Sequence, residues 1–317
     1  MKKFMSMILV AMMIVSLFAG CGPKADDGVT KVAIVQQLDH SSLDEIRTAI
    51  EAVLTEFGIE YKSFNGQNDS STLNQIGAQV VSDGYDAIIP IATLAAQCMV
   101  TAADGLDIPI IYAACSDPES AGLTGMNNVT GTSDALNTRF IIDMMLTINP
   151  EISCVGLLYS NSEINSATPI AEAKAYLDEK GIAYLEKTGT TSGEIVEAAA
   201  SLVGRVDAVF TPTDNAVMAA EASVAELLNA DGIPHYTGAD SFVLSGAFTT
   251  CGVNYTELGT KVGDMAFDIL LGGEIGSFHV MDGGIITVNT DTAKAVGVDY
   301  SVFSTMANTV IEATTAE

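Results

Sequence analysis

The sequence predicts an α/β protein with two doubly wound, parallel-sheet (Rossmann-like) lobes and a crevice between them. Three observations support this fold class. Short apolar runs alternate with amphipathic segments, the pattern starts again midway along the 317 residues, and several runs end in small polar side chains. The run at 208–215, AVFTPTDN, is the clearest example of a buried strand that opens into a polar loop. Ligands of open parallel sheets bind beyond the carboxyl ends of the strands.

The first half alternates strands with helices whose apolar side chains recur at helical spacing. In the segment Ser42–Phe57, six apolar residues fall on one face, and Gly58 follows as a stop signal. The predicted strands are Lys31–Gln37, Ile59–Asn65, Ala87–Thr93, Pro109–Cys115 and Asn128–Ser133, and the helices are Ser42–Phe57, Ser70–Ser82 and Leu94–Ala103.

The second half repeats this order after a helix at Asp134–Ile148, which Asn149-Pro150 ends. The predicted strands are Cys154–Tyr159, Ile182–Lys187, Ala208–Thr211, Pro234–Gly238 and Ala247–Gly252, and the helices are Glu163–Lys180, Gly193–Leu202, Asp214–Ala230 and Tyr255–Leu271. Two halves of similar length, both with polar strand ends, predict one cleft built from both.

Residues 1–20 have the pattern of an export signal. Lys2 and Lys3 precede an apolar stretch, and the segment ends in Leu-Phe-Ala-Gly before Cys21. This end resembles the bacterial lipobox, which implies lipidation of Cys21, although Phe18 stands where Leu is usual. An ordinary cleaved secretory signal is the alternative. In both cases the mature protein acts outside the cytoplasm, and residues 21–30 form a tether.

The charge balance narrows the classes of partner. Beyond residue 20, eleven basic side chains face forty acidic ones. Such an excess of negative charge repels nucleic acids and anionic membrane surfaces, so we expect no nucleic-acid partner and no membrane contact through the folded body.

The reactive side chains do not form a metal or catalytic motif. The cysteines lie in apolar contexts and are not spaced as metal ligands, which favours buried thiols: Cys98, Cys115, Cys154 and Cys251. One disulfide among them is the alternative. The sequence has no nucleophile elbow, P-loop, zinc-protease motif or dinucleotide fingerprint. We therefore expect no metal, no cofactor and no enzyme activity.

From Lys31 to about Val298 the chain resembles the substrate-binding lipoproteins of ABC transporters with the type 1 periplasmic-binding-protein fold, in the branch that includes tryptophan- and tyrosine-binding members. The resemblance rests on IVQQLDHSSLD, IIPIATLAAQ, IIYAACSDPESAGL, NVTGTSD, LLYSNSEINS, VDAVFTPTDN, the step GADS and GVNYTELG. It implies a monomer, anchored to the bacterial cell membrane by its lipid, that closes around a small ligand and delivers it to a membrane permease with a cytoplasmic ATPase.

The resemblance also implies a division into lobes joined by three crossings, near Ser133, Gly252 and Gly276. The expected N-terminal lobe comprises 31–133 plus 253–275, the C-terminal lobe 134–252 plus 276–300, and the remaining 301–317 a tail. Two departures from the family pattern, Thr93-Leu94 after the third strand and Gln37-Leu38 after the first, indicate a different cleft wall.

Position and resemblance together predict contacts for an amino-acid ligand. Thr93 and the amides of Leu94 and Ala95 suit its carboxylate, because a helix N-terminus binds anions. Asp214, Asp240 and then Asp117 are candidates for its ammonium, with helix capping as the alternative role. The other predicted contacts are Gln37, His40, Ser162, Asn165, Ser166 and Asn215.

The absence of certain residue types favours the same ligand class. No Lys or Arg lies in a loop that follows a predicted strand, which disfavours phosphates, sulfonates and dicarboxylates, and the absence of Trp disfavours sugars. The prediction is thus an extracytoplasmic solute-binding component of an ABC importer that captures an amino acid, plausibly aromatic. The alternative ligand is an amine or a nucleoside. The alternative role is that of a sensor that signals to a membrane receptor. A sugar-operon repressor is disfavoured because a signal peptide replaces the DNA-binding headpiece.

Overall fold

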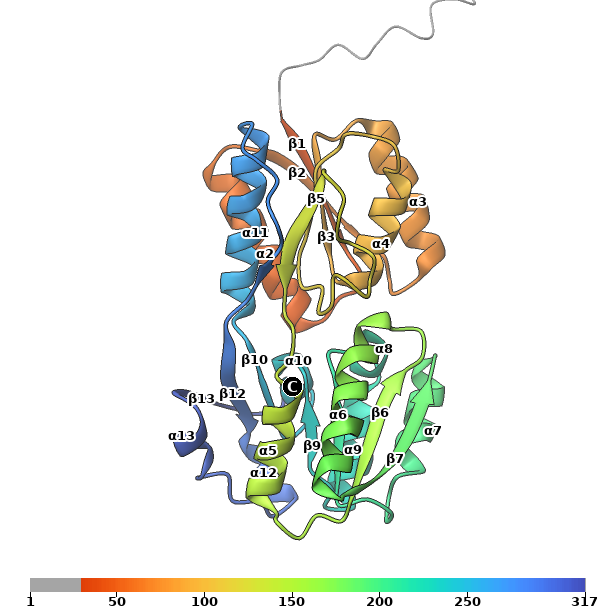
Figure 1. The fold of residues 1–317 in the computed structure, drawn as a ribbon, viewed down its shortest axis with the longest axis vertical. Helices are drawn as coiled ribbons and strands as arrows, with labels where there is room; N and C mark the ends of the chain where they lie inside the picture. Colours follow the sequence, from red (N-terminus) through yellow and green to blue (C-terminus); the bar gives the residue numbers. More distant parts are fainter. Residues whose placement is uncertain (1–29, 317) are drawn as a thin grey trace, which may run out of the picture. The chain divides into compact units, whose positions relative to one another are not determined.

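The protein is described from a computed structural model that covers residues 30–316. The predicted signal peptide, Cys21 and nearly all of the tether lie outside the described residues. Residues 31–317 form one compact unit. Within it, two α/β lobes are each built on one sheet, as Figure 1 shows, so the predicted fold class is confirmed.

The first lobe is organised around a six-stranded parallel sheet with the order β11-β5-β4-β3-β1-β2. Its strands are β1 (Lys31–Gln36), β2 (Glu60–Asn65), β3 (Ala87–Ile91), β4 (Ile110–Tyr112), β5 (Val129–Ser133) and β11 (His279–Val280), and its helices are α2 (Ser41–Glu56), α3 (Ser70–Asp83), α4 (Thr93–Ala102) and α11 (Tyr255–Leu270).

Alternation along β1 fixes which helices cover which face of this sheet. Val32 and Ile34 pack into the cluster formed by α2 and α11, whereas Ala33 and Val35 pack into the cluster formed by α3 and α4. Successive strand side chains point to opposite faces, so a strand with four consecutive apolar residues, 32–35, must be covered on both faces.

The second lobe contains a seven-stranded sheet with the order β13-β12-β10-β9-β8-β6-β7. Its strands are β6 (Cys154–Ser160), β7 (Ala183–Gly189), β8 (Ala208–Thr211), β9 (His235–Thr237), β10 (Thr249–Val253), β12 (Gly283–Asn289) and β13 (Thr309–Ala313). Only the β10–β12 pair of the named strands is antiparallel. The helical elements are α5 (Thr138–Ile148), η1 (Ile164–Ser166), α6 (Ala167–Lys180), α7 (Ser192–Ala200), α8 (Asn215–Met218), α9 (Glu221–Ala230), α10 (Asp240–Leu244), α12 (Thr290–Ala295) and α13 (Phe303–Met306).

The structure differs from the sequence-based boundaries in three places. The third crossing lies at residues 281–282, between β11 and β12, and not near Gly276, because β11 pairs with β5 of the first sheet. The expected tail at 301–317 contains α13 and the edge strand β13, which pairs with β12. The single helix expected at 214–230 is two, α8 and α9, with Ala219 and Ala220 between them.

The three crossings between the lobes are short. Residues 134–137 join β5 to α5, Asn254 alone joins β10 to α11, and residues 281–282 join β11 to β12. The Met281 amide donates to the Ser133 carbonyl at 2.9 Å, which ties the first crossing to the third.

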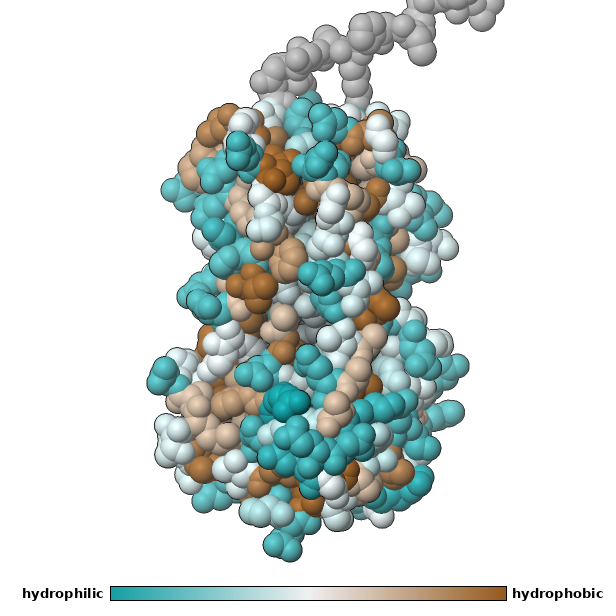
Figure 2. Space-filling model, viewed as in Figure 1, coloured by the Kyte–Doolittle hydropathy of each residue, from teal (hydrophilic) through white to brown (hydrophobic). Residues whose placement is uncertain are grey.

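The surface of the described residues is mixed in polarity on the face shown in Figure 2, and their cysteines are unpaired. Figure 2 shows hydrophobic residues dispersed among hydrophilic ones on the face turned to the viewer. Among the described residues, no helix has the length and apolar character needed to span a bilayer. The thiols of Cys98, Cys115, Cys154 and Cys251 are all free.

Helices α2 and α11 approach so closely that Gly259 has no room for a side chain. A Cβ atom there would lie 2.5 Å from the Ile46 carbonyl oxygen and 2.8 Å from the Ala49 Cβ. We expect Gly259→Ala to lower the free energy of unfolding by about 1–3 kcal/mol, because overpacking outweighs the gain in helix propensity. Urea denaturation measures this change in the free energy of unfolding. Gly193→Ala in α7, where nothing lies within 4 Å, is the matched control, and an equal effect of both variants would contradict this explanation.

Candidate functional site

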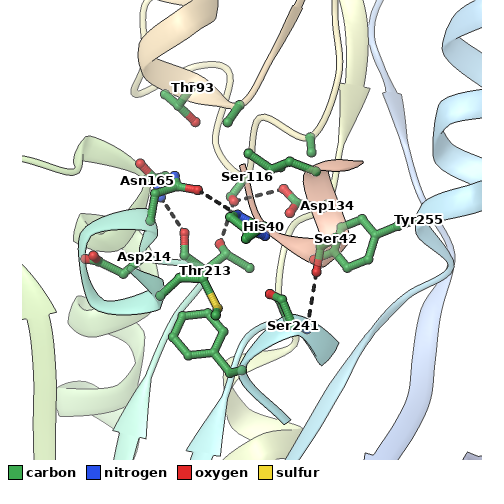
Figure 3. Close-up of a pocket in the computed structure, with 17 residues that line it drawn as sticks. His40, Ser42, Thr93, Ser116, Asp134, Asn165, Thr213, Asp214, Ser241 and Tyr255 are labelled. Atoms are coloured by element: carbon green, nitrogen blue, oxygen red, sulfur yellow. Dashed lines mark hydrogen bonds between the residues drawn. The ribbon is translucent and has the colours of Figure 1, made fainter. Parts of the chain in front are cut away.

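A cavity lies where the carboxyl ends of the strands of both sheets face each other. It encloses about 380 Å³ of empty space, part of it open to solvent. Figure 3 shows side chains from both lobes pointing into this region. The lining residues are His40, Ser42, Leu43, Ala92, Thr93, Ala114, Ser116, Asp134, Asn165, Thr213, Asp214, Asn215, Met218, Ala239, Ser241, Phe242 and Tyr255.

The first lobe presents a row of polar groups along its sheet edge. Thr93 follows β3, Ser116 follows β4 and Asp134 follows β5, and these three strands are neighbours in the sheet. Neighbouring strands lie about 4.8 Å apart, so Thr93 and Asp134 are separated by about 10 Å with Ser116 between them. A ligand that forms one hydrogen bond of about 2.8 Å with Thr93 and one with Asp134 has a few ångströms left between its two bonded atoms. This is the extent of an α-amino acid head group.

Asp134 is the buried carboxylate of this row. Its side chain is 4% exposed, and Oδ1 accepts a hydrogen bond of 2.9 Å from the Ser116 hydroxyl. No side chain or amide of another described residue is bonded to Oδ2. Burial raises the pKa of Asp134, since an isolated charge is costly away from water. A cationic group of a ligand would compensate this charge.

The backbone on this wall is held in an unusual conformation. Ala92 and Ala114, which precede Thr93 and Cys115, have φ values of 75° and 53°, a region that residues other than glycine seldom adopt. Both alanines line the cavity. The Thr93 amide, the first of α4, has no hydrogen-bond partner in the described part of the chain, and an unpaired amide at a helix N-terminus is suited to an anion.

The second lobe forms the opposite wall from the loop after β8. Asp214 is fully buried, and its carboxylate accepts hydrogen bonds from the Ser160 amide at 2.7 Å, the Ser166 hydroxyl at 2.7 Å and the Val217 amide at 2.9 Å. It is thereby the N-cap of α8. Burial raises its pKa, while these donors act in the opposite direction. Both oxygens of Asp214 are engaged within its own lobe.

Glu163 is a second buried acid close to this wall. Its Oε1 accepts from Gln37 Nε2 at 3.1 Å, across the lobes, and its Oε2 accepts from Asn215 Nδ2 at 3.0 Å. Burial, and next the negative charge of Asp214, raise the pKa of Glu163 to about 7. Glu163 therefore changes charge near neutral pH while it bridges the two lobes.

Further hydrogen bonds join the lobes around the cavity. Ser42 donates to Asp240 Oδ1 at 2.7 Å, Ser116 and Thr213 share a hydrogen bond of 2.9 Å, and Thr168 donates to Asp117 Oδ2 at 2.6 Å. His40 Nε2 lies 3.3 Å from Asn215 Oδ1. With this many contacts across the cleft, the structure represents a closed arrangement.

Five of the twelve predicted ligand contacts line the cavity, namely His40, Thr93, Asn165, Asp214 and Asn215. The other seven do not. Gln37 Oε1 accepts from the Leu94 amide, which occupies the amide predicted for a carboxylate. Asp117 accepts from Ser120 and Thr168, and Asp240 is bound to Ser42. Ala95, Ser162 and Ser166 are also outside the lining.

Sequence reasoning missed several of the lining residues. The sequence pattern predicts Asp134 only as the start of a helix, although NVTGTSD has the strand-then-polar pattern that singles out other positions. Ser42, Ser116, Ser241 and Tyr255 were also missed. Burial raises the pKa of Tyr255, and the charges of Asp134, Asp240 and Glu45 act in the same direction. No cationic side chain lines the cavity, and no acidic, Cys or His cluster with metal-site geometry occurs in the described residues.

Two α/β lobes that close on a polar cavity at their strand ends are the architecture of a bilobed solute-binding protein. The model of the family "ABC transporter substrate binding protein" matches residues 31–310. The chain is also 33% identical to a tyrosine-binding protein of Clostridioides difficile, covering 93% of this chain and 92% of that one. The protein belongs to the ABC transporter substrate-binding family, which makes it an extracytoplasmic protein that binds a small solute for an ABC permease.

Two solved structures are informative about the state of the cleft. An ABC domain from Streptococcus pneumonia in complex with L-Trp is 28% identical, with a TM-score of 0.83 over 89% of this chain and 100% of that one. A ligand-free, open substrate-binding protein with adhesive properties from Clostridium difficile is 32% identical, with a TM-score of 0.68 over 90% and 100%. The chain superimposes better on the complex despite the lower identity, in accord with closed lobes.

Proposed function

We propose that the protein binds an aromatic L-amino acid as the solute of its ABC importer. The observation that carries this proposal is the row Thr93–Ser116–Asp134, where an unpaired helix N-terminal amide and an uncompensated buried carboxylate lie two strand spacings apart, with room between them for an amino-acid head group. In this assignment Asp134 binds the ammonium and the N-terminus of α4 binds the carboxylate. Relatives that bind tyrosine and L-Trp support the aromatic side chain.

The ammonium assignment replaces the predicted one. Asp214 already accepts three hydrogen bonds from its own lobe, and Asp240 is bonded to Ser42. Asp134 keeps an oxygen that accepts no hydrogen bond from another of the described residues. We therefore propose that Asp214 shapes the wall as the cap of α8, and that His40, Thr93, Asn165 and Asn215 surround the ligand.

The apolar part of the cavity suits a ring. Leu43, Met218 and Phe242 line it together with Ala239 and Tyr255. Thioether and aromatic side chains make favourable contacts with aromatic rings. With no cation in the lining, a second carboxylate on the ligand would stay uncompensated, which disfavours glutamate and aspartate.

The remaining features of the proposal concern cellular context. The protein acts as a monomer, without catalysis, held at the membrane through a lipid on Cys21, and passes its ligand to the permease. The pattern of residues 1–21 supports the lipid anchor, and the family supports the transport role.

A thermal-shift screen tests the ligand class. We expect tyrosine or tryptophan to raise the melting temperature, because a ligand that binds only the folded state stabilises it by RT ln(1 + [L]/Kd), about 2.7 kcal/mol at a hundredfold excess over Kd. Tyramine, which lacks the carboxylate, and glutamate are the controls. Stabilisation by tyramine equal to that by tyrosine would contradict the carboxylate site, and no shift with any aromatic amino acid would contradict the proposed function.

A further inference from the structure

The orientation of the Asn215 side-chain amide is fixed by Glu163. Asn215 Nδ2 donates to Glu163 Oε2 at 3.0 Å, so its Oδ1 is the atom that faces His40 Nε2 at 3.3 Å. An amide oxygen can only accept a hydrogen bond. While Glu163 is ionised, His40 therefore carries its proton on Nε2 and donates it to Asn215.

The other ring nitrogen of His40, Nδ1, is consequently a buried hydrogen-bond acceptor. Desolvation by burial lowers the pKa of His40 to about 4, so the ring is neutral at physiological pH and its Nδ1 is a lone pair. Nδ1 is buried and forms no hydrogen bond with any residue that the structure describes, although His40 lines the cavity. His40 also occupies the N-cap position of α2 without capping it, so no helix amide uses this atom.

We propose that His40 Nδ1 accepts a hydrogen bond from a donor on the ligand's ring, so that the site selects an aromatic amino acid with a ring hydroxyl or N–H over phenylalanine. This inference rests on the proposed function. The selected group is a donor, because the hydrogen bond between His40 and Asn215 leaves Nδ1 no proton to give.

The neighbours of His40 place it beside the apolar part of the cavity. His40 is the N-cap of α2, three residues before Leu43, and its partner Asn215 lies three residues before Met218 on α8. Residues three apart on a helix are neighbours on one face, so His40 lies next to the apolar side chains that we assign to the ligand's ring. Figure 3 shows His40 in the middle of the lining residues.

Ionisation of Glu163 controls whether His40 Nδ1 accepts or donates a hydrogen bond. Protonated Glu163 must donate its own hydrogen, which requires the Asn215 amide to turn over, and its Nδ2 then donates to His40 Nε2. The imidazole proton moves to Nδ1, which becomes a donor. Asp214 faces Glu163, and Asp39 and Asp44 face His40. Because burial raises the pKa of Glu163 to about 7, the acceptor form prevails above pH 7 and is lost below it.

The test compares three ligands with the same head group, L-tyrosine, L-phenylalanine and O-methyl-L-tyrosine, by isothermal titration calorimetry at pH 6 and pH 8. We expect tyrosine to bind at least tenfold more tightly than the other two at pH 8, since a site with a buried acceptor rejects ligands that leave it unpaired. The ratio of tyrosine to O-methyl-L-tyrosine affinities should fall at pH 6, because the ether oxygen can accept only from the donor form of Nδ1, whereas the tyrosine hydroxyl pairs with either form. Effects of pH on head-group binding or lobe closure cancel in this ratio.

The variant His40→Gln keeps an N–H for Asn215 but removes the acceptor at the Nδ1 position. We expect it to weaken tyrosine binding toward that of phenylalanine and to leave phenylalanine binding within about twofold. Glu163→Gln should lower the ratio of tyrosine to O-methyl-L-tyrosine affinities at pH 8 and remove its pH dependence. Glu172→Gln, an exposed change on the adjacent helix α6, is the matched control and should leave the ratio unchanged.

The outcomes separate this inference from the proposed function. Equal affinities for tyrosine and phenylalanine in the unaltered protein overturn the inference while the function stands. Equal weakening of both ligands by His40→Gln places His40 at the head group and also overturns it. Binding of no aromatic amino acid under any condition contradicts the proposed function itself.

Discussion

The variant Asp134→Asn is expected to lose amino-acid binding while keeping its fold. Asparagine retains an oxygen for the Ser116 hydroxyl but has no charge for the ligand ammonium. Removing one partner of a buried charge pair costs about 2–5 kcal/mol, so the Kd for tyrosine should rise about thirtyfold or more. Calorimetry measures this loss, and Asp69→Asn, at the exposed N-cap of α3, is the control.

Stability in the absence of ligand distinguishes this role from a structural one. Burial raises the pKa of Asp134 above its unfolded value, so its ionisation costs stability as the pH rises from the unfolded to the folded pKa. Asparagine does not ionise, and the ligand-free variant should be at least as stable as the parent at pH 7. A marked loss of stability, or full tyrosine affinity, would show that Asp134 is not the ammonium partner.

The variant Asp214→Asn is expected to behave in the opposite way. An amide group in place of Oδ2 would face the Ser160 amide, a donor that cannot turn into an acceptor. A buried donor left without a partner costs about 1–3 kcal/mol, and the weakened bond to Ser166 adds to this. We expect a loss of about 2–4 kcal/mol in the free energy of unfolding, measured by urea denaturation of the ligand-free protein.

The pair of variants is informative because both acids line one cavity. The control Asp69→Asn should change stability by less than about 0.5 kcal/mol, since Asn and Asp cap helices about equally well. If Asp214→Asn kept its stability and abolished binding, the ammonium site predicted from the sequence would be correct and the assignment to Asp134 would fail.

Most of the fold could be predicted because local patterns determine it. Strands such as β3 are apolar throughout and are followed by polar residues, a pattern that buried parallel strands require. The two-residue β11 and the edge strand β13 could not be found in this way. β11 is exposed at both positions and β13 at most of its five, so neither has an apolar pattern, and only pairing with β5 and β12 defines them.

The site was harder to predict than the fold because a polar residue at a strand end has two possible uses. Thr93 and Asp214 follow strands in the same way, but Asp214 is bound by its own lobe and the Thr93 amide is not. Glu163 was expected only to start a helix, because its partners Gln37 and Asn215 are distant in the sequence. Such contacts depend on lobe closure, which no local pattern encodes.

The location of Asp134 within a four-residue crossing has a kinetic consequence. The other crossings have one and two residues, and the amide of Met281 holds the third against the end of β5. Lobes joined so tightly separate by turning about these segments, and a group on the axis of a rotation hardly moves. The open protein should therefore capture the ammonium first. Association would then proceed in two steps, a fast docking followed by a ligand-concentration-independent closure that sets the residence time.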